Sequence, residues 1–255
     1  MVLHPGTILQ FMYLKERLCR VRPGSFVEVG AGRGHVSACL LTLGWQGMGY
    51  EPDPESADAA RETNRDAIAA GRYRVIEGNW LDAPQGAKVD LVLSSMVLEH
   101  LSEADESRYL RRCREVLASG GTGVLLVPGS PPDWGIEDET AGHYRRYTYE
   151  RLDELLRREC WSVRHMAGLT YPLSNALLPL SNYLVLRHEG HKRGLSMPER
   201  TAASGKREVP GKTRFPGFMG LALNEMTMYP FHVLQKLCSR ARRALVIYVE
   251  FAPVT

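Results

Sequence analysis

The sequence lacks the cysteine pattern of a disulfide framework or a zinc site. Its 255 residues include five cysteines, an odd number, at positions 19, 39, 113, 160 and 238. None of them forms a Cys-x-x-Cys pair, the spacing that zinc sites and redox motifs usually contain. We therefore expect no metal site, and a chain that folds in a reducing compartment, the cytoplasm.

Long uninterrupted apolar runs are also missing. Residues 1–10 contain no apolar core of the kind that a signal peptide requires. The apolar stretch at residues 171–186 is 16 residues long and holds Pro172 and Pro179, so it is too short and too broken to span a bilayer. We expect no transmembrane segment, and we interpret this stretch as a cover over a substrate cavity or a contact for an apolar or lipidic partner.

A broad excess of positive charge is absent as well. The net charge is +3, but residues 187–214 alone carry eight Lys and Arg against three Glu, and the rest of the chain has 24 basic and 26 acidic residues. A nucleic-acid-binding protein usually shows a wider basic face, so nucleic acid is not the expected partner. Because the basic segment is rich in glycine and proline, we expect it to be irregular and mobile.

What the sequence does contain is an ordinary globular composition, with 44% hydrophobic and 24% charged residues. Apolar strand patterns alternate with helical ones, which predicts an α/β fold with a mostly parallel sheet. The expected strands are residues 26–29, 46–50, 73–76, 89–95, 122–127, 161–168 and 244–251. The expected helices are residues 4–20, 36–43, 55–70, 102–117 and 149–159, with a further helix at 218–241 that is interrupted at Pro230.

The first strand runs directly into a glycine-rich turn. Residues 26–35 read Phe-Val-Glu-Val-Gly-Ala-Gly-Arg-Gly-His, and a helical pattern follows at once. The first N–H groups of that helix have no intrahelical partner and face the turn, and glycines let a ligand approach the backbone closely. Such a turn binds the polar end of a nucleotide-like cofactor, a phosphate or a carboxylate, although a merely structural turn is the alternative.

The spacing of the glycines indicates which cofactor to expect. A dinucleotide site has the pattern Gly-x-Gly-x-x-Gly, but the third position of that pattern is His35. Here Gly30, Gly32 and Gly34 alternate, and Glu28 precedes them. We expect Glu28 near the mouth of the turn, where it would accept hydrogen bonds from an ammonium group and repel a pyrophosphate.

An acidic residue closes the second strand. Glu51 lies 21 residues after Gly30 and is followed by Pro52. Nucleoside-binding βαβ units hold ribose hydroxyls with a carboxylate at about this distance. We expect Glu51 to bind a ribose, and a solvated loop acid is the alternative.

Four features in the right order resemble the class I S-adenosylmethionine-dependent methyltransferases that act on small molecules. They are the Glu-x-Gly-x-Gly-x-Gly pattern at residues 28–34, Glu51, the pair Asn79-Trp80, and the Leu-Glu-His-Leu segment at residues 98–101. The resemblance covers about residues 5–168 and the last strand. It implies a doubly wound, Rossmann-like sheet of seven strands in the order 3-2-1-4-5-7-6, with the last strand antiparallel and helices on both faces. It also implies S-adenosylmethionine as cofactor and S-adenosylhomocysteine as product.

The cofactor contacts that the resemblance implies come mainly from strand ends. The residues are Glu28, Gly30, Ala31, Gly32, Gly34, Glu51, Pro52, Asn79, Trp80, Ser94, Ser95, Met96 and Tyr13. Asn79 stands where the family usually has an aspartate, but its carbonyl can still accept from an adenine amino group, and Asp82 is a competing candidate. Trp80 is expected either against the adenine or in the core, and Tyr13 either at the cofactor or in simple packing.

The substrate is expected at residues 128–147, a proline-rich polar and aromatic loop after the fifth strand. The implied contacts are Trp134, His143, Tyr144, Arg145 and Tyr147. His143 and His100 are candidate general bases. The alternatives are that the loop pins itself to the domain through these side chains, and that His100 caps local backbone.

We therefore predict one methyltransferase domain over residues 1–255. An N-terminal helical cap (1–22), an active-site loop (128–147) and a helical or mobile insertion (169–243) are expected to surround the substrate. The expected reaction moves a methyl group to an O, N or C nucleophile of a small metabolite or natural product. A peptide or lipid-linked acceptor is the alternative within the class. Two alternatives belong to other functional classes: a nicotinamide-dependent oxidoreductase, and a non-catalytic binding module on the same fold.

Overall fold

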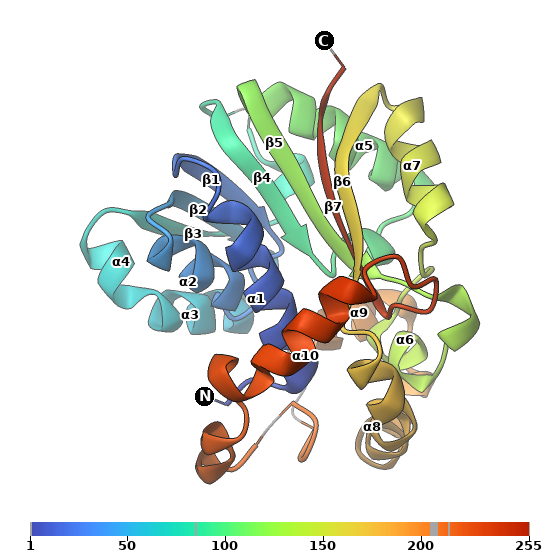
Figure 1. Ribbon diagram of the computed structural model, residues 1–255. Coiled ribbons are helices and arrows are strands. Elements are labelled where there is room, and N and C mark those ends of the chain that lie inside the picture. The colour runs from blue at the N-terminus through green and yellow to red at the C-terminus, as the bar shows by residue number, and fades with distance from the viewer. Residues whose placement is uncertain (1, 85, 205–208, 214, 255) are drawn as a thin grey trace. The chain divides into compact units, whose positions relative to one another are not determined.

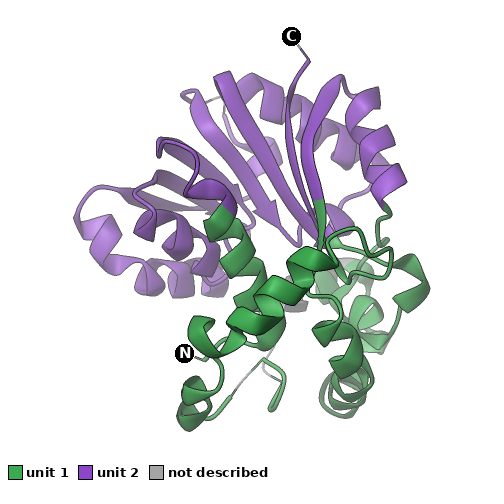
Figure 2. Cartoon of the chain, in the orientation of Figure 1, with its two compact units in different colours: residues 1–16, 128–148, 167–247 green, residues 17–127, 149–166, 248–255 purple. Residues whose placement is uncertain are grey.

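The computed structural model describes residues 2–84, 86–204, 209–213 and 215–254. The chain divides into two compact units (Figure 2). Unit 1 consists of residues 1–16, 128–148 and 167–247, and unit 2 of residues 17–127, 149–166 and 248–255. The cap, the active-site loop and the insertion expected from the sequence thus fall almost entirely in unit 1, whereas the regular alternation of strands and helices builds unit 2.

One seven-stranded sheet runs in the order β3-β2-β1-β4-β5-β7-β6 (Figure 1). The last strand is antiparallel, and the predicted fold class is confirmed. The strands are β1 (Ser25–Val29), β2 (Gln46–Glu51), β3 (Tyr73–Glu77), β4 (Val89–Ser95), β5 (Leu117–Pro128), β6 (Trp161–Leu169) and β7 (Val246–Pro253).

Parallel pairing aligns the carboxyl ends of the central strands. Val29 at the end of β1 is in register with Tyr50 of β2 and with Ser94 of β4. Glu51 is in register with Glu77 at the end of β3. Because ligands of open α/β sheets bind beyond the carboxyl ends of the strands, this edge of unit 2 is where the site is to be sought.

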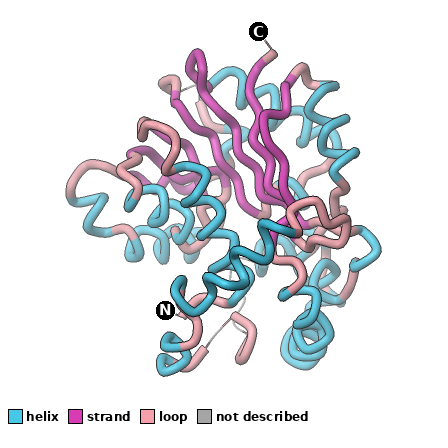
Figure 3. The backbone as a smooth tube through the Cα atoms, viewed as in Figure 1, coloured by secondary structure: helices cyan, strands magenta, loops and turns pink. Residues whose placement is uncertain are grey.

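The helices of unit 2 flank the sheet (Figure 3). They are α2 (His35–Thr42), α3 (Pro54–Thr63), α4 (Arg65–Ala69), α5 (Glu103–Val116) and α7 (Tyr149–Arg158), with short 3₁₀ turns η1 (Trp80–Asp82) and η2 (Leu98–His100). Two of the helices begin at a side-chain cap. Asp53 accepts from the Ser56 N–H at 2.8 Å to start α3, and Ser102 accepts from the Asp105 N–H at 3.2 Å to start α5.

The single helix expected over residues 55–70 is wrong in detail, because the chain breaks at Asn64 into α3 and α4. The Asn64 side chain is buried and donates to the carbonyls of Gly34 and Ala60, each at 3.0 Å. The break therefore ties α3 to the glycine turn. The fifth strand also starts earlier than expected, at Leu117, directly after α5.

Unit 1 is mostly helical. It contains α1 (Pro5–Leu18) as far as Glu16, then η3 (Pro131–Asp133), α6 (Ile136–Ala141), α8 (Leu173–Glu189), η4 (Gly190–Gly194), α9 (Met197–Ser204), η5 (Gly217–Leu221) and α10 (Glu225–Leu237). A small apolar cluster of Ile8, Leu9 and Met12 packs against Met228 of α10. The stretch 128–147, expected as a loop, thus includes the short helix α6.

Two expectations for the insertion need correction. Helix α10 is not interrupted at Pro230 but runs through it, as α8 runs through Pro179. Pro230 has no N–H and therefore cannot donate a hydrogen bond to the Met226 carbonyl. Because Met226 is 85% exposed, water can donate to this carbonyl instead. The basic segment, expected as irregular, forms η4 and α9, while residues 205–208 and 214 lie outside the described residues.

No helix among the described residues is both long and apolar enough to cross a membrane.

Candidate functional site

The glycine turn of unit 2 is held by strand β2. The N–H groups of Gly30 and Ala31 both donate to the Tyr50 carbonyl at 2.9 Å. The turn needs glycine for conformation, because φ is +72° at Gly30, +53° at Gly32 and +81° at Gly34.

Packing distinguishes Gly32 from the other two glycines of the turn, Gly30 and Gly34. A Cβ atom at Gly30 would lie 2.5 Å from Val97 Cγ2, and one at Gly34 would lie 2.4 Å from the Asn64 side chain. At Gly32 a Cβ atom would meet nothing within 4 Å. Gly30 and Gly34 therefore let the turn fit against the protein, whereas Gly32 faces open space that a ligand can enter.

Glu51 faces this turn. One of its carboxylate oxygens accepts from the Gly32 N–H at 2.8 Å and the other from the Asp53 N–H at 3.0 Å. The residue is 8% exposed. Burial raises the pKa of this carboxyl, and the two backbone bonds oppose the rise. The geometry thus holds a carboxylate at the open glycine, as a ribose site requires.

Glu28 lies deeper than the sequence suggested. It is 1% exposed, and the Ser37 hydroxyl donates to its carboxyl group. Ser37 Oγ is in turn 2.7 Å from the Tyr73 hydroxyl. The burial places this carboxyl beneath the turn and not at its mouth, and it raises the pKa of Glu28 to about 8. Its role toward an ammonium group stays a prediction.

Asn79 caps the 3₁₀ turn that follows β3. Its side-chain carbonyl accepts from the Leu81 N–H at 3.1 Å, and its amide donates to Asp82 at 2.8 Å. Asp82, the competing candidate, also pairs with Arg108 at 2.8 Å. A carbonyl oxygen has two lone pairs, so Asn79 keeps one acceptor site for an adenine amino group, and that role stays a prediction.

Trp80 is a core residue in this structure. It is 2% exposed, its ring lies 5.3 Å from that of Tyr109, and the Arg112 guanidinium lies 5.1 Å from its centroid. The burial corrects the expectation of a face open to adenine and favours the alternative of core packing. The sequence does not reveal this burial, because the side chains that cover Trp80 come from α5, far along the chain.

The end of β4 carries an unusual backbone. Met96 has φ +56°, a conformation that is uncommon without glycine and that clusters at functional sites. Its N–H donates to the Leu126 carbonyl of β5 at 2.8 Å, which holds the bend in place. Ser94 is buried and its Oγ lies 3.0 Å from the Tyr109 hydroxyl, so its side chain serves the interior, while Ser95 is half-buried.

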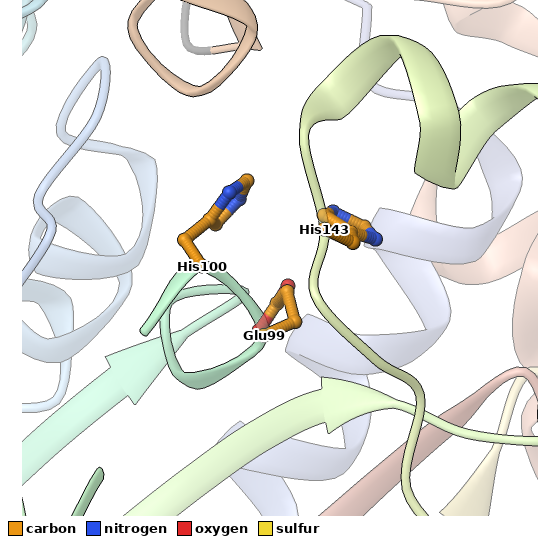
Figure 4. A group of neighbouring side chains, drawn as sticks. All are labelled: Glu99, His100 and His143. Carbon is orange, nitrogen blue, oxygen red and sulfur yellow. The ribbon is translucent and has the colours of Figure 1, made fainter. Parts of the chain in front are cut away.

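The turn η2 follows and bears Glu99 and His100 (Figure 4). Glu99 is 0% exposed and His100 is half-buried. The His100 N–H donates to the Val97 carbonyl at 3.0 Å, which is a backbone role. A catalytic role of its ring stays a prediction.

In unit 1, His143 follows α6 (Figure 4) and is held by a carboxylate that the sequence analysis missed. Its Nδ1 lies 2.9 Å from Asp138 Oδ1, and its N–H donates to the Asp138 carbonyl at 3.0 Å. Arg146 Nε donates to the same carboxylate at 2.9 Å, and Arg146 also donates to the Gly129 carbonyl at 3.1 Å.

This arrangement orients the His143 ring, and its role as a general base stays a prediction. Burial would raise the pKa of Asp138, but hydrogen bonds from His143 and Arg146 outweigh it, and the pKa lies below its usual value. A charged carboxylate at Nδ1 favours the tautomer with the proton there, which leaves Nε2 as the basic nitrogen. An aspartate five residues before a histidine carries no recognised signal, so only the structure reveals the pair.

The other expected substrate residues of unit 1 differ in exposure. Trp134 is 41% and Tyr144 49% exposed, and the Arg145 guanidinium lies 5.7 Å from the Tyr144 ring centroid. Tyr147 is 0% exposed, and its N–H donates to the Pro128 carbonyl at 2.8 Å. Its side chain therefore packs inside unit 1, a correction to the substrate contact expected of it.

Tyr13 is also a packing residue here. It is 6% exposed, and its ring meets that of His232 edge-on at 6.4 Å. This geometry favours simple packing, the alternative named for Tyr13 from the sequence.

The sheet order and the glycine turn beside Glu51 together define the fold of the class I methyltransferases. Comparisons with known proteins agree. The sequence profile of the family described as "Methyltransferase domain" matches residues 27–125. This part of the chain is therefore similar to a methyltransferase domain, and the sheet order is that of Rossmann-like methyltransferases.

Curated relatives are similar to part of the chain. Phenazine-1-carboxylate N-methyltransferase of Pseudomonas aeruginosa is 29% identical over 163 residues, which are 60% of this chain and 48% of that protein. The 2,7-dihydroxy-5-methyl-1-naphthoate 7-O-methyltransferase of Streptomyces carzinostaticus is 31% identical over 150 residues, 57% of this chain and 43% of that protein. The chain thus spans about half the length of these curated relatives.

A solved structure matches over almost the whole chain. It is the glycopeptide N-methyltransferase MtfA in complex with S-adenosylmethionine, with a TM-score of 0.56 and 14% identity over 96% of this chain and 87% of that one. At this identity the match shows the fold alone.

Proposed function

We propose that this protein transfers the methyl group of S-adenosylmethionine to an O, N or C nucleophile of a small metabolite or natural product. The observation that carries the proposal is the pair formed by Gly32 and Glu51. The open glycine and the carboxylate bonded to its N–H at 2.8 Å form a site for a nucleoside with a charged tail. The relatives named for phenazine and naphthoate substrates support a small aromatic acceptor.

Two features of unit 2 support this cofactor. The Glu51 carboxylate can accept from both hydroxyls of a ribose, and the backbone at Gly32 borders open space. Glu28 lies beneath the turn with a pKa of about 8, so a nearby ammonium group would favour its charged form. Bound S-adenosylmethionine supplies a methyl carbon attached to a positively charged sulfur, which is a good leaving group.

In this proposal His143 is the base for an acceptor with an O–H or N–H group, and the contact of its Nδ1 with Asp138 supports that role. Its Nε2 would take the proton of the acceptor as the new bond to carbon forms, and Asp138 would stabilise the protonated ring through Nδ1. Positioning supplies up to about 7–11 kcal/mol of such a reaction, while a base adds about 10²- to 10⁴-fold. An activated carbon acceptor would need no base.

The proposal is tested first by cofactor binding. We expect S-adenosylhomocysteine to raise the melting temperature of the full chain and NAD(H) to leave it unchanged. Gly32→Asp should abolish the effect, because it fills the open turn with a side chain and a negative charge beside Glu51.

Gly71→Asp is the matched control. Gly71 also has a positive φ, of +69°, and nothing within 4 Å of a Cβ atom, so the two changes carry similar backbone strain. Normal binding by Gly32→Asp would refute the cofactor placement, and stabilisation by NAD(H) alone would support the oxidoreductase instead.

The acceptor is tested with labelled methyl donor and a metabolite extract, followed by mass spectrometry of the product. A labelled small molecule supports the proposal. Label in a peptide or a lipid-linked product would support the alternative acceptors. Cofactor binding without any labelled product would support a non-catalytic module.

A further inference from the structure

Helix α10 of unit 1 presents an unusual distribution of side chains. It buries Met228, His232 and Gln235, which are 4%, 5% and 1% exposed. Two of these three residues are polar. A surface helix of a globular protein normally turns its apolar stripe inward, so α10 has the reverse arrangement.

The outward face of α10 is apolar. Met226 is 85%, Tyr229 59%, Val233 39% and Leu237 80% exposed. At about 100° per residue these four residues, which we call the outer stripe, lie opposite the three buried ones. The preceding turn η5 adds Phe218 and Leu221, which are 75% and 84% exposed.

Hydrogen bonds fix the rotation of the helix. The Gln235 carbonyl accepts from the Thr170 N–H at 2.9 Å, and the Gln235 amide donates to the Leu9 carbonyl at 3.0 Å. These two partners define which end of the amide is nitrogen. The amide therefore also donates to His232 Nδ1, at 2.8 Å.

The chain of bonds continues to α1. Because His232 Nδ1 accepts, the proton is on Nε2, which donates to Glu16 at 2.9 Å. Lys236 donates to both oxygens of the same carboxylate, at 2.6 and 2.7 Å. Turning the apolar face inward would break all of these bonds and bury their partners, at the cost that unsatisfied polar groups carry. The exposure of the outer stripe is thus a fixed property of unit 1.

The charge around α10 indicates what covers the outer stripe. Residues 215–247 hold four basic residues, Lys236, Arg240, Arg242 and Arg243, against one acidic residue, Glu225. With their ion-pair partners Lys15, Glu16 and Asp133, the group has five positive and three negative charges, a net +2. Glu225 is paired with Lys15. Arg240 is exposed and forms no ion pair with any residue that the structure describes.

We propose that the outer stripe of α10 rests on the surface of an anionic lipid bilayer. An interfacial helix combines exposed apolar side chains with nearby basic ones, and each Lys or Arg near an anionic surface contributes to binding. A second copy of the chain would bring the same excess of positive charge against this face, which disfavours self-association. This inference concerns where the protein acts, and it does not depend on the proposed methyl transfer.

The test is flotation of the full chain with vesicles of phosphatidylcholine alone, and of phosphatidylcholine with phosphatidylglycerol at three to one. We expect binding to the anionic vesicles only, and weaker binding when salt is raised. The double variant Met226→Gln, Leu237→Gln should lower the partition coefficient by at least about tenfold, because both side chains would lose their apolar contact with the bilayer. Arg240→Gln should lower it by about fivefold.

The matched control is Val21→Gln with Val254→Gln. These two residues of unit 2 are 50% and 58% exposed, so their replacement removes exposed apolar side chains elsewhere and should leave binding unchanged. Unchanged melting temperatures show that the variants fold. Equal loss in the control and the α10 variant, or no binding to anionic vesicles, would overturn the proposal. Sedimentation velocity completes the test: a dimer that the α10 variant dissociates, without vesicle binding, would assign the stripe to a second copy.

Discussion

Both compact units bury polar side chains, but these side chains have different roles in the two units. In unit 2 they gather at the carboxyl ends of strands, where Glu51 holds the open glycine turn and Glu28 lies beneath it. In unit 1 they join distant segments, as Asp138 does with His143 and Arg146, and as Gln235 does with Thr170 and Leu9. The first arrangement leaves a polar group available to a ligand, and the second uses its polar groups to orient structure. Four predictions test whether the buried polar groups of the two units differ in this way.

The largest effect is expected at His143. If it is the base, His143→Gln should lower the rate of methyl transfer by about 10²- to 10⁴-fold and leave the affinity for S-adenosylhomocysteine unchanged. His188→Gln, at an exposed histidine, is the control. The measurement is single-turnover transfer to the acceptor found in the extract. A rate equal to that of the control would show that His143 is not the base.

Asp138→Ala should be the most destabilising change in unit 1. It leaves the buried Arg146 guanidinium without its carboxylate, which costs about 3–5 kcal/mol. Asp153→Ala removes the partner of Arg157 from an exposed pair, with side chains 38% and 75% exposed, and should cost no more than about 0.5 kcal/mol. Urea unfolding of both variants provides the comparison. Similar midpoints would mean that Asp138 does not orient this part of the chain.

Glu51→Gln should weaken S-adenosylhomocysteine binding by about 10- to 100-fold, since it replaces charged hydrogen bonds to the ribose with neutral ones. The free protein should lose some stability, because the amide oxygen can replace only one of the two carboxylate oxygens that accept from the Gly32 and Asp53 N–H groups. Calorimetric titration measures the affinity, and thermal unfolding the stability. Loss of stability without loss of affinity would place Glu51 among the residues that only orient structure.

The smallest effect is a dependence on pH at Glu28. Burial raises the pKa of this carboxyl from 4.5 to about 8 in the folded protein. The folded state thus keeps a proton that the unfolded state loses above pH 4.5. The stabilisation that this proton provides is lost as the pH rises from 4.5 to about 8, and above that pH neither state holds the proton. Relative to Glu28→Gln, the free wild-type protein should therefore become less stable from pH 5 to 8 and change little above pH 8, as followed by melting temperature.

Cofactor binding should show the opposite trend. An ammonium group at Glu28 requires the charged carboxylate, so affinity for S-adenosylhomocysteine should rise by up to about tenfold per pH unit between pH 6 and 7. The variant Glu28→Gln should remove this dependence. Parallel pH profiles for both proteins would contradict an ammonium site at Glu28.

The fold of unit 2 was predictable because its signals are local. Apolar runs such as residues 89–95 form strands, glycine ends helices, and Asp53 and Ser102 cap the helices that follow them. The break between α3 and α4 at Asn64 was not predictable from local signals. It is accompanied by a hydrogen bond from the Asn64 side chain to the Gly34 carbonyl, 30 residues away in the sequence. The positive φ of Met96 is likewise imposed by the neighbouring strand.

The candidate site was predictable only in part, for the same reason. The position of Glu51 at a strand end followed from the sequence, but the depth of Glu28 and the burial of Trp80 and Tyr147 depend on side chains that arrive from other elements. In unit 1 the apolar pattern of α10 alone would turn Met226 and Leu237 inward. The partners of His232 and Gln235 on α1 and at the end of β6 decide otherwise.

The sequence alone predicts the order of strands and helices, the glycine turn and the acidic residue that closes β2, because each depends on residues near one another in the chain. Which side chains are buried and which border open space depends on contacts between distant segments. The tertiary structure placed the open space at Gly32 alone, joined Asp138 to His143, and turned the apolar side of α10 outward. Burial and hydrogen bonding between distant segments set these outcomes, and no local pattern encodes them.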